Sequence, residues 1–294
     1  MTDLLKRIKD GEILVADGAA GTLLVEYGLK SGEPPESFNL TRTDVLEKIA
    51  GLYLDSGADI IQANTFGASS LRLSMHSLED KTEMINRNAV RAARKVVKDR
   101  AYIYGSCGPT GKILKPYGDT EPDQVYESFL NQLEILVDEG VDVIFVETMT
   151  DLTEATLAVK AAKALSSVPV FATMTFDHTP RGFYTFMGVS VESAARGLEG
   201  AGVDGLGSNC GNGIENMIKI AEEYKKHTRL PLVIQSNAGI PKIDGDRIVY
   251  PETPEFMSEK AKELISLDVS IIGGCCGTTP AHIREIRRVV DSLS

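Results

Sequence analysis

The sequence predicts an α/β fold, a (β/α)8 (TIM) barrel, and three observations lead to this prediction. Eight short apolar runs rich in β-branched residues alternate with stretches of helical periodicity along the 294 residues. Successive runs are separated by enough chain for a helical crossover, which parallel strands require. No interdomain linker is visible, so residues 1–294 are expected to form a single domain. A doubly wound open sheet is the alternative that this pattern leaves open.

The predicted strands are short, and most are followed by a polar or cysteine-containing motif. They are expected at residues 13–16, 59–63, 101–105, 141–146, 169–174, 203–208, 230–235 and 269–272. In a (β/α)8 barrel the carboxyl ends of the strands form one rim, and active sites lie there. The polar motifs are therefore expected to share one face of the molecule.

The helices are predicted from periodic apolar positions and from capping residues. Thr43 and Asp44 can cap the helix that follows them, and Pro280 lies in the first turn of the last helix. The expected ranges are 23–27, 45–53, 81–99, 123–139, 152–165, 190–201, 215–227, 255–267 and 280–290. Loops are expected at residues 34–39 and 178–186, and Asp244-Gly245 predicts a hairpin turn.

Composition and charge narrow the class of protein. Apolar residues make up 43% and charged residues 25%, which are ordinary values for a globular domain. The net charge of −11 disfavours nucleic acids and anionic membrane surfaces as partners. No run is long enough for a membrane-spanning helix, and residues 1–10 lack the apolar core of a secretion signal. A cytoplasmic location is therefore expected.

Three of the four cysteines follow predicted strands in a pattern that favours a metal. Cys275 and Cys276 are adjacent in a glycine-rich turn after the eighth strand, and neighbouring cysteines rarely form a disulfide. Cys210 ends the sixth strand, a near neighbour around the rim. Three thiolates favour Zn²⁺ over hard cations, and ligands from distant strands indicate a catalytic site with an open position. Inert buried cysteines are the alternative.

The remaining cysteine and the histidines carry no such pattern. Cys107 follows the third strand and is expected to be a small buried residue. The four histidines sit away from the strand ends and are interpreted as surface or loop residues: His76, His178, His227 and His282.

Distinctive motifs stand at the strand ends: Asp17–Thr22, Gln62–Ala68, Gly108–Gly111, Glu147–Asp151, Asn209-Cys210, Ser236–Gly239 and Gly273–Pro280. Through these motifs the chain resembles the homocysteine S-methyltransferase family, most of all the homocysteine-binding module of cobalamin-dependent methionine synthases. The resemblance implies a homocysteine-binding barrel over residues 1–294. It also implies that Cys210, Cys275 and Cys276 hold zinc and that the homocysteine sulfur takes the fourth position.

The resemblance also gives roles to other residues of the rim. Asp17 and Glu147 are carboxylates suited to the α-ammonium group, with a cap or a salt bridge as the alternative role. The amides of Gly18 and Ala19 can bind the α-carboxylate where the first loop enters a helix, unless they form an ordinary turn. Three further residues complete the expected set, with local loop bonding as their alternative: Asn64 and Thr65 in the amino-acid pocket, and Asn237 as a neutral metal ligand when substrate is absent.

The resemblance implies methyl transfer to the homocysteine thiol, giving methionine. A free thiol has a pKa of about 8.5, and zinc coordination leaves a reactive thiolate near neutral pH. Methylcobalamin on a separate corrinoid protein or domain is the expected donor. S-methylmethionine and betaine are alternatives, although the absence of tryptophan weakens the case for a cage around betaine. A non-enzymatic barrel that binds phosphate in its strand-eight loop is the remaining alternative.

Overall fold

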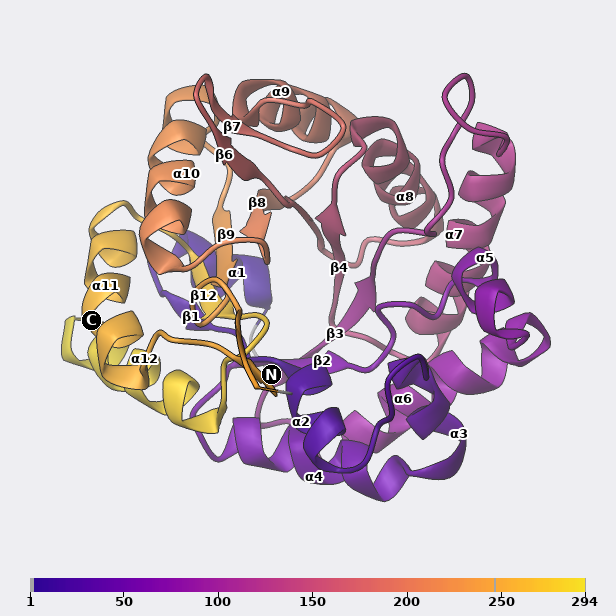
Figure 1. The fold of residues 1–294 in the computed structure, drawn as a ribbon, viewed down its shortest axis with the longest axis horizontal. Coiled ribbons are helices and arrows are strands. Elements are labelled where there is room, and N and C mark those ends of the chain that lie inside the picture. The colour runs from indigo at the N-terminus through magenta and orange to yellow at the C-terminus, as the bar shows by residue number, and fades with distance from the viewer. Residues whose placement is uncertain (1–2, 246, 294) are drawn as a thin grey trace.

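An eight-stranded parallel sheet forms the centre of the structure, a computed structural model that describes residues 3–245 and 247–293 (Figure 1). The strands pair in the order β1-β12-β9-β8-β5-β4-β3-β2. A parallel bridge between Ala16 and Ile60 joins the two ends of this series, so the sheet closes into a barrel. The predicted (β/α)8 fold is confirmed. The strands are β1 Leu14–Val15, β2 Ile60–Ala63, β3 Tyr102–Cys107, β4 Val143–Met149, β5 Val170–Met174, β8 Gly205–Asn209, β9 Leu232–Ser236 and β12 Ile271–Gly274.

Helices surround the barrel as an outer ring (Figure 1). Side chains cap several of them: Glu121 and Gln124 form a capping box at α7, and the Asp151 carboxylate accepts from two amides at α8. The prediction that Thr43 and Asp44 cap the helix that follows them is wrong, because α4 already begins at Thr43 and its N-cap, Arg42, makes no side-chain cap bond. The buried faces of the helices pack on the outward-facing apolar residues of the strands. These helices are α2 Ala20–Glu26, α4 Thr43–Leu54, α6 Thr82–Val97, α7 Pro122–Asp138, α8 Leu152–Leu165, α9 Val191–Ala201, α10 Ile214–His227, α11 Pro254–Ser266 and α12 Pro280–Leu293. No helix of the described residues is both long and apolar enough to cross a bilayer.

Several short elements were not predicted as such. The loop expected at residues 34–39 contains a 3-10 turn, Pro35–Ser37, and the short helix α3, Phe38–Thr41. The polar loop at 178–186 contains the hairpin β6 Asp177–Thr179 and β7 Gly182–Tyr184. The turn predicted at Asp244-Gly245 joins β10 Lys242–Asp244 to β11 Arg247–Val249. The others are α1 Leu4–Lys9, α5 Ser70–Leu73 and the 3-10 turns Ser74–His76 and Glu79–Lys81.

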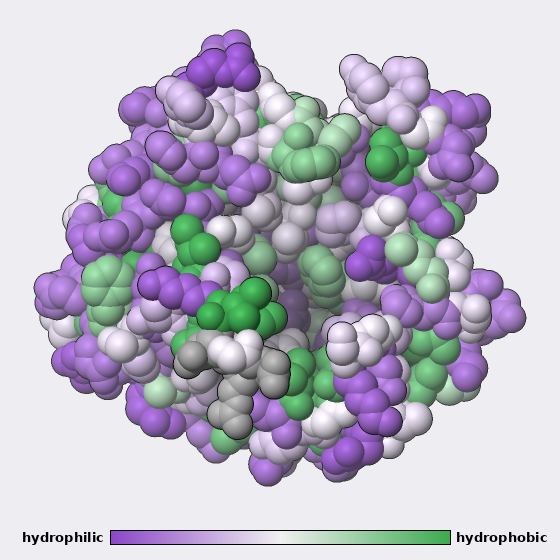
Figure 2. Space-filling model, in the orientation of Figure 1, coloured by the Kyte–Doolittle hydropathy of each residue, from purple (hydrophilic) through white to green (hydrophobic). Residues whose placement is uncertain are grey.

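The barrel interior is a packed core. Phe145 stacks on Phe171 with ring centroids 5.3 Å apart, and Tyr104 lies 4.7 Å from Phe145. Leu4 of α1 belongs to the same buried cluster, so this helix closes the amino-terminal end of the barrel. With that end filled, a site can form only where the strands end, and the molecule is hollowed at the centre of the ring (Figure 2).

Candidate metal and substrate site

Three cysteine sulfurs converge at the carboxyl ends of β8 and β12. The Sγ atoms of Cys210, Cys275 and Cys276 all lie within 4.8 Å of one another, and the Cys210 and Cys276 sulfurs are 3.8 Å apart. All three are free thiols and are partly exposed. Sulfurs at this spacing can face one ion, so the predicted convergence of these side chains is found in the structure.

Strand β9, which lies between β8 and β12, holds the cysteine loops in place. The Cys210 N–H donates to Gln235 O at 3.1 Å, and the Cys275 N–H donates to Ser236 O at 2.7 Å. Cys210 itself has a φ of +60°, a left-handed conformation that is uncommon for a residue with a side chain. The backbone at Cys210 is therefore held in a conformation of higher energy, and such backbone strain is often found at functional sites.

Three thiolates at this spacing repel one another, so they are stable together only beside a positive charge. Hydrogen bonds from Cys210 and Cys275 lower the pKa of Cys276. The same contacts with Cys210 and Cys276, together with burial, raise the pKa of Cys275. Full ionisation of the cluster therefore requires a positive charge among the sulfurs, and a soft divalent cation fits this donor set.

Two buried carboxylates lie inside the rim and are linked by one residue. The Gln62 N–H donates to Asp17 Oδ2 at 2.7 Å, and the Gln62 side-chain amide donates to Glu147 Oε1 at 3.0 Å. The Ser106 hydroxyl also donates to Glu147 Oε1, and the Asn209 amide is 3.4 Å from Oε2. The structure thus brings together the two acids that the sequence predicted as ammonium ligands.

Neither carboxylate has a cationic partner among the residues that the structure describes, and burial favours the neutral form of each. Burial, as the largest cause, raises the pKa of Asp17 to about 8 and that of Glu147 to about 7. Asp17 Oδ1 is buried without a hydrogen-bond partner among the described residues. A bound ammonium group would supply both the missing charge and the missing donor.

Thr278 packs the loop after β1 against the loop that carries Cys275 and Cys276. A Cβ added to Gly18 would lie 2.7 Å from Thr278 Oγ1, so glycine allows this close approach. The Ala19 N–H donates to Thr278 Oγ1 at 3.1 Å. Ala19 would have to exchange this partner to bind a carboxylate, and the role predicted for Gly18 and Ala19 stays a prediction.

Asn64 and Thr65 make local bonds that shape the rim. The Asn64 amide donates to Pro35 O at 2.9 Å and to Asn39 Oδ1 at 2.7 Å. The fully buried Thr65 hydroxyl donates to Ser106 O and accepts from Ser106 N–H. These contacts match the alternative of loop bonding, and a direct role in the amino-acid pocket stays a prediction.

Asn237 offers a spare acceptor at the end of β9. Its side chain is buried, and Asn237 Oδ1 has no partner among the described residues. Its backbone N–H donates to Asn212 O at 3.0 Å, which ties it to the loop after Cys210. An unpaired buried oxygen next to the cysteine loops agrees with the predicted neutral ligand, since such a group usually has a partner.

Two other predictions have clear outcomes. Cys107 is fully buried, with Sγ 3.4 Å from Gln132 Oε1, as expected for a small core residue. The interpretation of His282 as a surface or loop residue is wrong: it is 6% exposed in the first turn of α12. It accepts from the Thr279 N–H at Nδ1 and contacts Glu252 O through Nε2, so it caps its own helix.

Sequence reasoning missed the residues that orient the carboxylates. Gln62 and Ser106 were placed within or just after predicted strands, and neither was assigned a role. The only available signal was a polar side chain next to an otherwise apolar run, and such a residue more often faces solvent.

The strand-eight loop has little free capacity for a phosphate. Its amides at positions 274, 275, 277, 278 and 279 all donate within the protein, the first to Asp17 O at 2.9 Å and the third to Thr22 Oγ1 at 3.2 Å. A phosphate cradle needs several unpaired amides aimed at one point. The alternative of a phosphate-binding barrel therefore finds no support in this loop.

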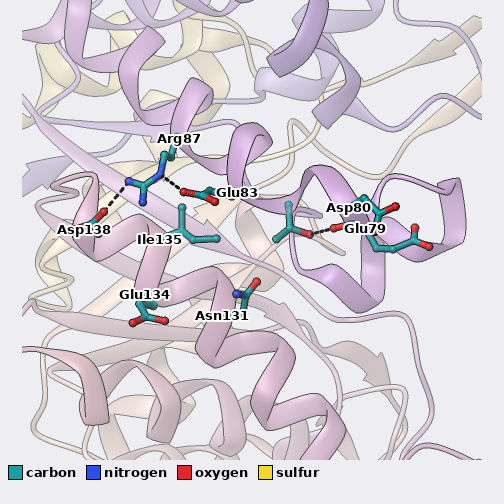
Figure 3. A pocket seen from close by; sticks show the side chains of 9 residues that line it. Glu79, Asp80, Glu83, Arg87, Asn131, Glu134, Ile135 and Asp138 are labelled. Carbon is teal, nitrogen blue, oxygen red and sulfur yellow. Dashed lines mark hydrogen bonds and ion pairs between the residues drawn. The ribbon is translucent and has the colours of Figure 1, made fainter.

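A second pocket lies outside the barrel, between α6 and α7 (Figure 3). Arg87 occupies it and pairs with Asp138 at 2.7 Å and Glu83 at 2.9 Å. These are surface ion pairs of two packed helices, which contribute little stability individually. None of the residues that line this pocket belongs to the rim at the carboxyl ends of the strands.

The chain is similar to known proteins both in sequence and in fold. A family model described as homocysteine S-methyltransferase matches residues 14–290. The methionine synthases of Mycobacterium leprae and Mycobacterium tuberculosis are each 32% identical to the chain, over 98% and 99% of its length. The chain spans about a quarter of the length of these curated relatives (25% and 26%). The metallated form of the homocysteine methyltransferase MmuM from Escherichia coli superposes with a TM-score of 0.81 at 20% identity, covering 97% of this chain and 99% of that one.

Proposed function

The chain belongs to the homocysteine S-methyltransferase family, and on that premise we propose that it transfers a methyl group to the thiol of homocysteine, giving methionine, with zinc held by Cys210, Cys275 and Cys276. The single observation that carries this proposal is the convergence of the three sulfurs within 4.8 Å of one another. They lie on the same rim as Asp17 and Glu147, two buried carboxylates for which the described residues offer no cationic partner.

The residues present fit a zinc ion. The donor set is three thiols, which suits a soft divalent cation and leaves a tetrahedral position for one more ligand. The unpaired Asn237 Oδ1 is a candidate for that position in the substrate-free protein. When bound, zinc would supply the charge that keeps a fourth sulfur, that of homocysteine, as a thiolate near neutral pH.

The carboxylates would orient the amino acid. Asp17 and Glu147 would bind its ammonium group, with Gln62 holding both acids in register. Ammonium binding would return both carboxyls to the charged form, because a nearby cation lowers a carboxyl pKa. The substrate would thus be fixed at both ends, which is how positioning contributes to a methyl transfer.

For the donor, we propose methylcobalamin carried by a separate corrinoid protein or domain. The support is the 32% identity to two methionine synthases over nearly the whole chain. S-methylmethionine or betaine is the second candidate, supported by the fold shared with MmuM, although 20% identity carries the fold alone.

A turnover assay with three donors tests this function. Zinc-loaded protein and homocysteine would be incubated in parallel with methylcobalamin, S-methylmethionine and betaine, and methionine would be quantified. The proposal expects methionine, formed fastest from methylcobalamin. Methionine formed only from S-methylmethionine or betaine would overturn the donor assignment, and none from any donor would overturn the enzyme assignment.

A further inference from the structure

The backbone is left-handed at two positions of the rim, Thr148 on β4 and Cys210 directly after β8. Both residues have a φ of +60°, a conformation that residues with a side chain seldom adopt. The pairing of β4 with β5 also shifts its register here, between Val146 and Met149. Since Thr148 directly follows Glu147, the orientation of the Glu147 carboxylate depends on a strained piece of backbone that its surroundings must hold in place.

The side chain of Asn209, at the end of β8, holds the strained backbone at Thr148. The Thr148 N–H donates to Asn209 Oδ1 at 2.8 Å, and Asn209 Nδ2 donates to Thr148 Oγ1 at 2.7 Å. A backbone N–H can only donate, so the amide oxygen must face it and the amide nitrogen is left as the donor. That nitrogen also lies 3.4 Å from Glu147 Oε2. Asn209 therefore supports both Thr148 and the carboxylate before it.

Asn209 is itself fixed at its side chain and at its backbone. The Thr173 hydroxyl donates to Asn209 Oδ1 at 2.7 Å, and the Thr175 hydroxyl donates to Asn209 O at 2.9 Å. Asn209 is only 1% exposed, so its hydrogen bonds are shielded from water. The next residue in the chain is Cys210, a candidate metal ligand. One buried, fully bonded residue thus joins the carboxylate end of the site to the sulfur end.

A substrate that is held at both ends must match the distance between them. Homocysteine would reach the metal with its sulfur and Glu147 with its ammonium group. Cysteine carries the same two groups but has one methylene less, so in a rigid site it can satisfy only one end at a time. A difference of one methylene supplies about 10- to 200-fold discrimination when the site does not adapt to it.

We propose that Asn209 is a positioning residue that sets the distance between the ammonium end and the sulfur end of the site, and thereby selects homocysteine over cysteine. This inference rests on the proposed function, because it assumes that Glu147 binds the ammonium group and that Cys210 binds the metal. It goes beyond that function by naming the residue that measures the length of the amino acid.

Thr173→Val tests this inference without changing an acid, a cysteine or Asn209 itself. Valine keeps the shape of the side chain and removes the hydroxyl, whose one hydrogen bond among the described residues goes to Asn209. Zinc-loaded protein would be titrated by calorimetry with homocysteine and, separately, with cysteine. We expect homocysteine to bind about three- to tenfold more weakly, the factor that one hydrogen bond supplies. Cysteine should lose less, because it does not use both ends, so the ratio of the two affinities should fall.

Thr228→Val is the matched control. Thr228 is also a buried threonine, but it lies before β9 at the opposite end of the barrel, where its hydroxyl donates to Glu199 and accepts from the Leu230 N–H. Both affinities should match those of the parent protein. Asn209→Ala removes the support itself and should lower the ratio further than Thr173→Val. Its fold is checked by circular dichroism, and Thr173→Val decides the question if Asn209→Ala does not fold.

The ratio of affinities separates positioning from a general loosening of the site. An equal loss for both amino acids in Thr173→Val would overturn the inference, as would unchanged affinities or a parent protein that does not discriminate between homocysteine and cysteine. A parent protein that binds neither zinc nor homocysteine is a different outcome, because it would overturn the proposed function.

Discussion

Asp17 and Glu147, which are 130 residues apart in the sequence, are held in register by Gln62, which donates its backbone N–H to one carboxylate and its side-chain amide to the other. The link supplies hydrogen bonds to two acids that have no cationic partner in the part of the chain that the structure describes. Both oxygens of Glu147 accept hydrogen bonds, whereas Asp17 accepts at Oδ2 only and its Oδ1 has no partner among the described residues. The pair is therefore prepared for a ligand that brings positive charge.

Glu147→Gln tests the ammonium end of this pair. The amide keeps the shape of the side chain and removes the charge, so homocysteine should bind about 10- to 100-fold more weakly, the loss of a charge-assisted hydrogen bond. Zinc content should stay full, because Glu147 is not among the sulfur ligands. Calorimetric titration of zinc-loaded protein with homocysteine measures this.

The control for that experiment is Glu154→Gln. Glu154 is also a buried glutamate, but its carboxylate accepts from the N–H and hydroxyl of Thr110, away from the cysteine cluster. Homocysteine affinity should be unchanged in this variant. An unchanged affinity in Glu147→Gln would remove Glu147 from the substrate site.

The raised pKa of Asp17 predicts how stability depends on pH. Its pKa is about 8 in the folded protein and about 3.9 in an unfolded chain, so between these values the folded state holds more protons. Stability must therefore fall as pH rises through this window. Asp17→Asn cannot titrate, so it should lose less stability than the parent between pH 5 and pH 8, by on the order of 3 kcal/mol. Urea unfolding of both proteins without metal at the two pH values measures this, and equal losses would show that Asp17 is not buried as an acid.

A glycine of β8 should be essential for closing the barrel near Cys210. A Cβ on Gly207 would lie 1.8 Å from the backbone oxygen of Val233, on the neighbouring strand β9. Gly207→Ala should therefore destabilise the protein by at least about 3 kcal/mol, because backbone atoms cannot move aside cheaply.

Gly200→Ala is the matched control. Nothing lies within 4 Å of its added Cβ, and the residue is in helix α9, where alanine should gain about 0.5–1 kcal/mol. Urea unfolding of both variants measures the difference. Equal stability of the two would mean that β8 and β9 do not approach as closely as the structure has them.

The barrel could be predicted from the sequence because each strand is marked by its own run of apolar residues, which can be recognised without knowing its neighbours in space. The runs at 169–174 and 230–235 are mostly apolar, and they become β5 and β9 within two residues of the prediction. The carboxyl ends of the strands were less predictable: β3 extends to Cys107 and β4 to Met149, because parallel neighbours continue the pairing through polar residues. Tertiary pairing overrides local composition there.

The residues of the candidate site also fall into those that the sequence could predict and those that it could not. The places of Cys210, Cys275, Asp17 and Glu147 on one rim could be predicted, because each was expected at the end of an apolar run and has distinctive chemistry. The bonds of Gln62 could not be predicted, because they join residues that are distant in sequence. His282 was placed wrongly for a similar reason, since its burial depends on Glu252, thirty positions earlier in the chain.

The assignment of zinc to Cys210, Cys275 and Cys276 is tested by measuring zinc content, and proton release on addition of homocysteine, in four cysteine variants. We predict that Cys210→Ala, Cys275→Ala and Cys276→Ala each lose most of the zinc and the proton release, because two sulfurs hold the ion poorly and only thiol ligation frees a proton near neutral pH. Cys107→Ala should keep both, since its sulfur faces Gln132 in the outer core. Circular dichroism should show an intact barrel in all four variants. Loss of zinc from Cys107→Ala with retention in Cys210→Ala would contradict the account, because the metal would then lie elsewhere on the rim.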